Sequence, residues 1–219
     1  MTSFDSFSPG ALRFLADLSE NNEKAWFEAH RAAYEAEIKG PSRAFAAALA
    51  DTLETMTGRA HGYKVLRIHR DIRFSKDKRP YNAYIRISIA PFQGGANDPA
   101  WFFGVDPVAL SLGCGVFQFD KTGLLAFRDR VAGDRGGALD QTVTGLEATG
   151  HRISPPELKR VPSGYDKDHP RAALLRRKGL TAWADHPATP FATAPGLVPR
   201  VREAFERLQP LFAALSDGT

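Results

Sequence analysis

The stretch LRIHRDIRFSKDKRPYNAYIRISI, residues 66–89, decides the fold class because the spacing of hydrophobic residues changes within it. Before it, apolar residues recur about every four positions, as on one face of a helix. Near its end they alternate with polar residues, as on one face of a strand. We predict strands over 66–74 and from residue 84, joined as a hairpin. Their apolar faces would carry Leu66, Ile68, Ile72 and Phe74, and Ile85, Ile87 and Ile89.

Three helices are expected before this stretch. Ser8 followed by Pro9 is typical of a helix start, and Asn22 can cap a second helix. Gly40-Pro41 is expected to end the second helix and to open a third. The apolar residues at helical spacing are Leu12, Leu15, Leu18, Trp26, Phe27, Tyr34, Ile38, Phe45, Leu49 and Leu53.

The pattern after residue 89 predicts more strands and then more helices. Strands are expected over 101–106, 108–117 and 180–184, and helices over 121–132, 137–148 and 197–215, with a long loop over 149–170. Pro210 should kink the last helix or end its first part. This order predicts an α+β fold: a helical N-terminal layer packed on a mainly antiparallel central sheet, with further helices in the C-terminal half. The length of 219 residues predicts a single domain over 1–219.

Composition favours a globular, cytoplasmic protein. Hydrophobic residues make up 43% and charged residues 25% of the chain, and no apolar run is long enough for a membrane span. The first ten residues lack a basic start and an apolar block, so we expect no signal peptide. A single cysteine, Cys114, cannot form an internal disulfide, and the apolar alternation around it predicts a buried structural residue.

Positive charge is concentrated in two segments. Residues 64–86 hold eight Lys or Arg against two Asp, and residues 159–178 hold seven against two, whereas the rest of the chain is net negative by seven. Such asymmetry points to an anionic partner near these segments, which we expect to be neighbours. Alternatively, the two segments bind no partner and are solvated surfaces whose charges form salt bridges within the protein.

The hairpin is the candidate binding site, because guanidinium forks match phosphate and carboxylate oxygens. The predicted ligand-binding residues are Arg67, Arg70, Arg73, Lys76, Lys78, Tyr81 and Arg86. Any proton transfer would fall to Asp71, His69, Asp168 or His169. Asp168 and His169 lie in the second basic segment. The alternative there is a capped turn, with Asp166 or Asp168 as the N-cap and Pro170 opening a short helix.

Arg70 breaks the alternation, because a regular strand would point it toward the apolar side. Either a bulge re-aims it, or it is a buried arginine that needs an acidic partner. The hairpin arginines could also be structural and pair with acidic side chains of the helical layer. Those acids are Glu20, Glu23, Glu28, Glu35 and Glu37.

Four blocks of the sequence resemble a widespread bacterial and fungal family of conserved uncharacterised proteins, a domain of unknown function. They are NNEKAWFEAHRAAYE, RIHRDIRFSKDKRPYNAYI, GCGVFQFD and LKRVPSGYDKDHPRAALLRRKGL. The resemblance runs from about Phe4 to Phe212 and implies one intact domain, without an activity. The family often has KSF where this chain has KGL at 178–180, which puts a role for a hydroxyl there in doubt.

Three functions remain open at this level: binding of a small phosphorylated or other anionic ligand, with or without acid–base catalysis; nucleic-acid binding; and a non-enzymatic interaction module with structural arginines. A small ligand predicts a concave pocket with converging arginines, and nucleic acid predicts an extended basic track. The six histidines show no metal-ligand spacing, and no nucleotide-binding loop is present, so we expect no metal and no cofactor.

Overall fold

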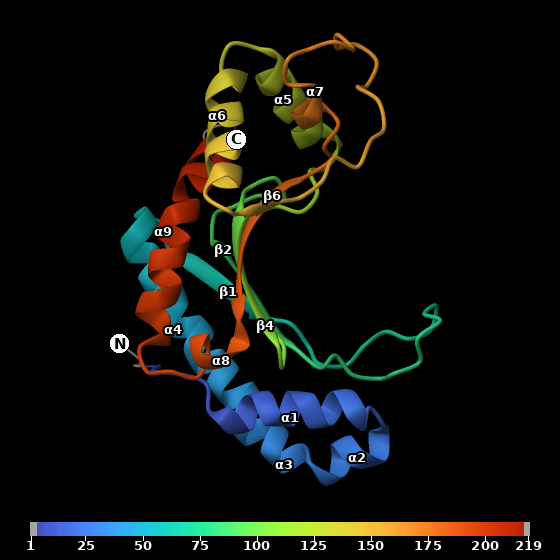
Figure 1. The fold of residues 1–219 in the computed structure, drawn as a ribbon, viewed down its shortest axis with the longest axis vertical. Coiled ribbons are helices and arrows are strands. Elements are labelled where there is room, and N and C mark those ends of the chain that lie inside the picture. The colour runs from blue at the N-terminus through green and yellow to red at the C-terminus, as the bar shows by residue number, and fades with distance from the viewer. Residues whose placement is uncertain (1–3, 217–219) are drawn as a thin grey trace. The chain divides into compact units, whose positions relative to one another are not determined.

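The computed structural model of the chain describes residues 4–216. Their elements, seen in Figure 1, are α1 (Pro9–Glu20), α2 (Lys24–Ala29), α3 (Arg31–Ala33), the π-helix η1 (Tyr34–Lys39), α4 (Gly40–Thr57), β1 (His61–Val65), β2 (Ile85–Pro91), β3 (Ala100–Val105), β4 (Ala109–Val116), α5 (Lys121–Ala132), α6 (Gly136–Ala148), β5 (Arg152–Ile153), α7 (Ala172–Leu175), β6 (Leu180–Pro187), α8 (Ala188–Phe191) and α9 (Leu197–Ser216). Helices at both ends and strands between them confirm the α+β fold class.

Six strands of the described chain form one sheet in the order β1-β2-β3-β4-β6-β5. β1 pairs with β2 and β5 with β6, both antiparallel, which agrees with the expected mainly antiparallel sheet. β3, β4 and β6 occupy the three strand ranges predicted after residue 89. At the turn between β3 and β4, Asp106 Oδ1 accepts hydrogen bonds from the N–H groups of Val108 and Ala109, both at 2.8 Å.

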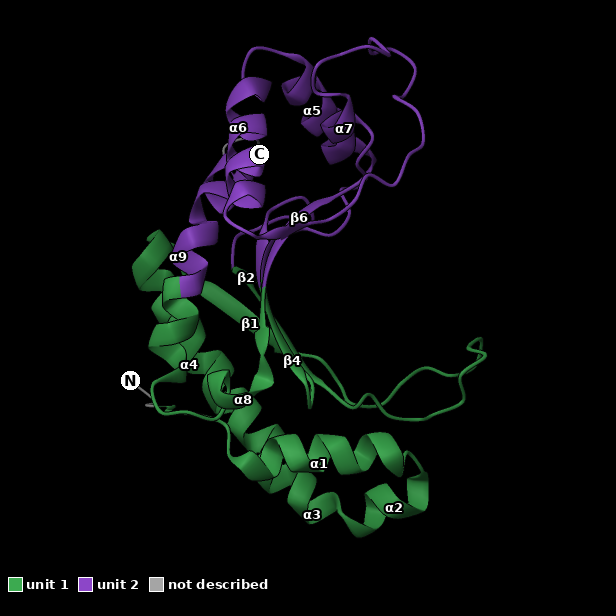
Figure 2. Ribbon diagram, in the orientation of Figure 1, with its two compact units in different colours: residues 1–91, 102–112, 185–203 green, residues 92–101, 113–184, 204–219 purple. Residues whose placement is uncertain are grey.

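The chain divides into two compact units (Figure 2). Unit 1 comprises residues 1–91, 102–112 and 185–203, and unit 2 comprises residues 92–101, 113–184 and 204–219. The first basic segment lies in unit 1 and the second in unit 2. That the two segments are neighbours therefore stays a prediction, as does the single domain.

Unit 1 is built around aromatic contacts between the helices and the sheet. Phe45 of α4 lies 4.6 Å from Phe103 of β3, and Phe7 lies 5.6 Å from Phe45, measured between ring centroids. The Ser8 side chain caps α1 by accepting the Ala11 N–H at 3.0 Å, as predicted. The isoleucines of β2 at 85, 87 and 89 are buried, which confirms their common face.

Unit 2 has its own aromatic core. Trp101 lies 4.9 Å from Phe205 and 4.8 Å from Phe212, both on α9. Cys114 of β4 is fully buried, which confirms the structural reading, and burial raises the pKa of its thiol. A buried, protonated thiol is a poor nucleophile.

The predicted strand over 66–74 is wrong. β1 ends at Val65, and residues 66–84 form a long loop between β1 and β2. Of the four residues expected on its apolar face, Ile68 is buried, whereas Leu66 and Phe74 are 43% and 95% exposed. The segment lacks a continuous partner strand, because β2 begins only at Ile85. Its single ladder contact is the bridge between His69 and Tyr81.

Two helix boundaries also differ from expectation, and a third expectation is decided in part. Gly40-Pro41 does not end a helix: the chain passes through the π-helix η1, where the Gly40 N–H bonds to the Glu35 carbonyl, and continues directly into α4. Glu23, not Asn22, occupies the N-cap of α2. α9 continues past Pro210, so the proline does not end the helix, and the expected kink stays a prediction. The position of Pro210 is exposed, while Leu211 and Phe212 beside it are buried. Packing of those residues holds the helix together across the proline.

In the part of the chain that the structure describes, no helix combines the length and hydrophobicity that crossing a membrane requires.

Candidate functional site

The loop of residues 66–84, called the basic loop below, projects from unit 1 on the side of the sheet away from α4 (Figure 2). It carries six Lys or Arg and two Asp. Backbone hydrogen bonds close its base, from the Arg70 N–H to the Pro80 carbonyl at 2.8 Å and from the Asn82 N–H to the Ile68 carbonyl at 2.7 Å. The two limbs therefore run side by side without forming regular strands.

Two copies of a D-x-R turn shape the outer part of the basic loop. In both, one carboxylate oxygen of the aspartate accepts the backbone N–H and the Nε–H of the arginine, and the other accepts Nη2. The Nη2–Oδ2 distances are 2.7 Å for Asp71 and Arg73 and 2.8 Å for Asp77 and Arg79. This side-on pairing fixes each guanidinium and leaves its Nη1 edge unbonded to any described residue.

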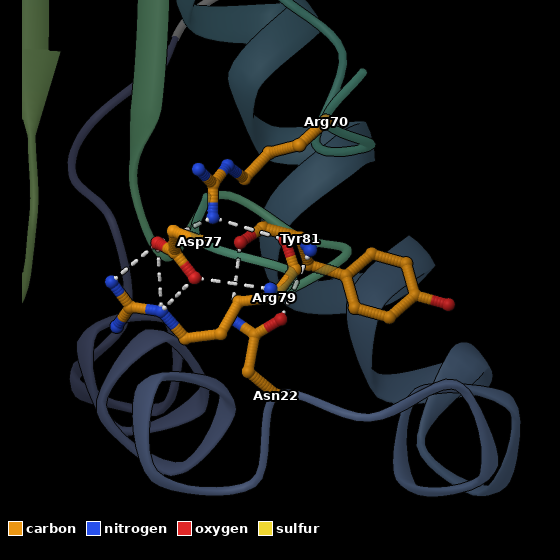
Figure 3. Close-up of polar contacts among 5 residues, drawn as sticks. All are labelled: Asn22, Arg70, Asp77, Arg79 and Tyr81. Atoms are coloured by element: carbon orange, nitrogen blue, oxygen red, sulfur yellow. Dashed lines mark hydrogen bonds and ion pairs between the residues drawn. The ribbon is translucent and has the colours of Figure 1, made fainter. Parts of the chain in front are cut away.

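Arg70 is less exposed than Arg73 and Arg79 and binds other residues of the loop (Figure 3). Its Nη1 donates to Asp77 Oδ2 at 2.8 Å and to the Arg79 carbonyl at 3.0 Å, and its side chain is 24% exposed. The acidic partner that its position required is thus present. It comes from the loop itself, whereas the glutamates Glu28 and Glu35 of the helical layer pair with Arg31 and Lys39. Arg70 is a residue that positions the loop.

The paired arginines change the acidity of both loop aspartates. Hydrogen bonds from Arg79, and then from Arg70, hold the pKa of the Asp77 carboxyl well below its usual range. Hydrogen bonds from Arg73 lower the pKa of Asp71 in the same way. A carboxylate with a lowered pKa is a weak proton acceptor at neutral pH. The arrangement therefore does not favour the predicted role of Asp71 as a base.

These pKa shifts predict how the loop responds to acid. Because the folded-state pKa of Asp77 is depressed, its stabilising pairing is complete above the ordinary carboxyl pKa of 3.8 and is lost as the pH falls through the folded-state value. We expect the Asp77 carboxyl carbon to titrate by NMR at lower pH in the native protein than in urea. Equal midpoints in the two states would show that the Asp77 pairs do not form in solution.

Aromatic residues anchor the base of the loop to the N-terminal helices. The Tyr81 ring stacks on Phe27 of α2 at 4.2 Å, and His69 packs edge-on against both rings. Tyr81 is 4% exposed, so its packing leaves little ring surface for the predicted ligand contact. His69 is exposed.

Asn22 fixes the same point from the helical side (Figure 3). Its Oδ1 accepts the Tyr81 N–H and its Nδ2 donates to the Tyr81 carbonyl, both at 3.0 Å. The amide therefore pairs with one loop residue as a neighbouring strand would. This explains why Asn22 does not cap α2.

Replacing Asn22 with Asp should destabilise the protein by about 2 kcal/mol, because Asp keeps the acceptor but leaves the Tyr81 carbonyl without its donor. Urea unfolding would measure the change. Asn21→Asp is the matched control, since Asn21 donates only to the Asp17 carbonyl at the exposed end of α1. Equal effects of the two substitutions would contradict a special role for the Asn22–Tyr81 pair.

The remaining predicted cations are exposed. Lys78 Nζ donates to the Ile72 carbonyl at 3.1 Å and so ties the two D-x-R turns together. Arg86, on β2, stacks over the Tyr84 ring at 4.2 Å. Arg67 and Lys76 are exposed, and the charge of Arg67 contributes to the lowered pKa of Asp71.

The second basic segment uses much of its charge inside unit 2. Arg171 donates from Nε to the Val131 carbonyl at 2.6 Å and from Nη2 to the carbonyls of Ala132 and Gly133, which closes the C-terminal end of α5. A guanidinium in this place is favourable because helix C-termini carry unpaired carbonyls and partial negative charge. Arg177 is 5% exposed, and burial lowers its pKa.

Asp168 and His169 lie in a turn of unit 2. The Asp168 N–H bonds to Asp166 Oδ1 at 2.9 Å, and the Asp168 side chain is 78% exposed. Asp166 thus stabilises a turn, but the expected helix start at Pro170 is wrong, because α7 begins at Ala172 with Arg171 at its N-cap. His169 Nδ1 accepts the Arg171 N–H at 3.0 Å, which places its proton on Nε2. His69 and Asp71 belong to unit 1, so the four predicted catalytic residues divide between the units, and their catalytic role stays a prediction.

Two cavities occur in unit 2, and neither is lined by a predicted site residue. One, of about 630 Å³, follows α5 and includes Phe119, Phe127 and Arg130. The other, of about 520 Å³, lies beside α6 and α9. Within residues 4–216, no group of three His, Cys, Asp or Glu side chains is placed to hold a metal ion.

Comparison with known families places the chain. Residues 10–213 match the family described as conserved hypothetical protein (DUF2461). The chain belongs to the DUF2461 family. The DUF2461 match covers nearly all of both units, including the basic loop and the second basic segment. No curated protein matches the chain.

Three important residues of the site were missed or misplaced by sequence reasoning. Asp77 organises two arginines, Asn22 binds the loop, and Phe74 lies exposed at its tip. The repeated D-x-R pattern was the available signal for Asp77. The sequence held no signal for the role of Asn22, because its partner Tyr81 is 59 positions away.

Proposed function

We propose that the protein binds an anionic, phosphate-bearing ligand through the basic loop. The observation that supports this most directly is the pair of D-x-R turns. Each holds an exposed guanidinium in a fixed orientation, with the Nη1 edge of Arg73 or Arg79 left for another acceptor. The arginine side chains are 76% and 59% exposed.

The physical advantage lies in the fixed orientation of the donors. A free arginine loses side-chain entropy when it binds, whereas one already held by an aspartate has lost it on folding. The aspartates offset part of the charge, yet six cations against two carboxylates leave the loop net positive. A phosphate group would meet oriented donors within a favourable electrostatic potential.

The paired aspartates favour binding without acid–base chemistry. Asp71 has a lowered pKa and both of its oxygens engaged by Arg73. The proposed role is therefore recognition of phosphate, with Arg73, Arg79, Lys76, Lys78, Arg67 and Arg86 as contact residues and Arg70 and Tyr81 as positioning residues.

Titration of the protein with inorganic tripolyphosphate at low salt, followed by calorimetry, tests this proposal. We expect binding that weakens as salt is added and that Arg73→Lys reduces several-fold, because lysine keeps the charge but cannot form the side-on fork with Asp71. Arg31→Lys serves as the control, since Arg31 pairs with Glu28 on α2–α3, outside the loop. Absence of binding, or equal effects of the two variants, would refute the proposal.

A further inference from the structure

Phe74, at the tip of the basic loop, is 95% exposed and is the most exposed large hydrophobic residue in the described chain. It directly follows the first D-x-R turn and lies three positions before the second. A single exposed apolar side chain on a surface needs no explanation by itself. The surroundings of this one, however, are ordered and charged.

Hydrogen bonds on both sides of Phe74 order the loop backbone. Asp77 joins two arginines, Lys78 bonds across to the Ile72 carbonyl, and the Ser75 N–H bonds to the same carbonyl at 3.3 Å. An ordered backbone reduces the conformational entropy that the loop loses when something packs against Phe74. The tip is therefore suited to contact with a flat apolar partner.

Two basic residues lie close to Phe74 in the sequence, and one of them is near its ring. The Arg73 guanidinium carbon lies 5.9 Å from the centre of the Phe74 ring, and Lys76 is exposed two positions further on. A partner that matches this tip needs an apolar face with negative charge close beside it. Nucleotides combine an apolar face with negative charge, because the base can stack on a ring and the phosphate is attached to the same unit.

The positive charge continues from the loop onto the sheet. On β1 and β2, Lys64 stands opposite Ser88, and the Leu66 N–H bonds to the Arg86 carbonyl, so these positions share one face. Arg86 extends across Gly104 of β3, whose position for a Cβ lies 3.9 Å from the Arg86 Cγ. The buried isoleucines of β2 occupy the opposite face of the sheet. On β3, the buried ring of Phe103 packs against Phe45 of α4.

We infer that unit 1 binds single-stranded nucleic acid, with one base stacked on Phe74 and neighbouring phosphates bound by Arg73 and Arg79. The strand would extend toward Lys64 and Arg86 on the exposed face of β1 and β2. An unpaired strand is favoured over a duplex because its bases are free to stack on a protein ring. This inference rests on the proposed binding of phosphate and adds that the phosphate groups belong to a nucleic-acid strand.

A lipid surface is a less suitable partner for this loop. Amphipathic helices that attach to membranes bury a continuous apolar face beside their basic residues. The tip between the two D-x-R turns offers one apolar ring, Phe74, and Ile72, inside the first turn, is partly buried.

Fluorescence anisotropy with two labelled strands of equal length and charge tests the inference. One is an oligothymidylate, and the other is an abasic deoxyribose-phosphate strand. We expect the full protein to bind the oligothymidylate about tenfold more tightly, because stacking requires the base. Phe74→Ala should remove this difference and leave binding of the abasic strand unchanged. Phe92→Ala is the control, since Phe92 is also exposed, at 73%, but belongs to unit 2.

The other outcomes separate the inference from the proposal beneath it. Equal binding of both strands, or equal weakening of both by Phe74→Ala, would overturn base stacking while phosphate binding stands. Binding of tripolyphosphate without binding of either strand would overturn nucleic acid as the carrier. Phe74-dependent binding to vesicles of phosphatidylserine and phosphatidylcholine that is tighter than binding to the oligothymidylate would assign the tip to membranes instead.

Discussion

The double variant Arg73→Ala, Arg79→Ala should bind an oligothymidylate about 100-fold more weakly than the parent protein at about 50 mM salt, because each lost phosphate contact also removes one counterion released on binding. The slope of log K against log salt should become less negative by about 1.4, because each phosphate contact with a single strand contributes about 0.7. The melting temperature should hardly change, since ion pairs between exposed side chains contribute little to stability. Anisotropy titrations at several salt concentrations, with a thermal melt, measure all three quantities.

Arg31→Ala is the matched control for this variant. It also removes an exposed arginine that is paired with a carboxylate, but from α3. We expect its affinity to remain within about twofold of the parent protein, since Arg31 lies outside the basic loop. If the double variant binds normally but melts at a much lower temperature, the arginines serve only to hold the fold.

Gly115→Ala should destabilise unit 2 strongly, by about 4 kcal/mol, through backbone strain and overpacking together. Gly115 on β4 has φ = +132°, and a Cβ there would lie 2.1 Å from the Leu180 carbonyl oxygen. Neither the backbone angle nor the neighbouring strand β6 can adjust easily. Thermal unfolding should show a decrease in melting temperature of about 10 °C.

Gly145→Ala provides the opposite result as a control. Gly145 lies within α6, and a Cβ there would meet nothing within 4 Å. Alanine should therefore stabilise the protein by about 0.5–1 kcal/mol, because glycine is the poorer helix former. If both substitutions lowered the melting temperature equally, the close approach of β4 and β6 at Gly115 would be in doubt.

Much of the fold follows from local sequence signals. The Ser8-Pro9 start of α1, the alternating isoleucines of β2 and the Asp106 turn depend on residues close in sequence, and all three were predictable. The segment 66–74 misled because its apolar residues alternate as in a strand. Alternation indicates a strand only where a partner strand exists, and here the backbone is held by side chains of the loop itself.

The sequence indicated which segment to consider as a candidate site, but not how its residues pair with one another. Clustered arginines pointed to the segment that forms the basic loop, and Arg70, if not re-aimed by a bulge, was expected to need an acidic partner. That the partner is Asp77, and not a glutamate of the helices, depends on how the loop folds back on itself. The contact between Asn22 and Tyr81 joins distant parts of the chain, which periodicity cannot reveal.

Direct observation of the loop arginines during binding is the most decisive measurement. In ¹H–¹⁵N spectra of the guanidinium groups, titration with an oligothymidylate should shift the Nε–H resonances of Arg73 and Arg79 and leave that of Arg31 in place. The Phe74 ring protons should shift upfield as a base stacks on them. Shifts confined to other residues, such as Arg130 in the α5 cavity, with Arg73, Arg79 and Phe74 unchanged, would contradict binding at the basic loop.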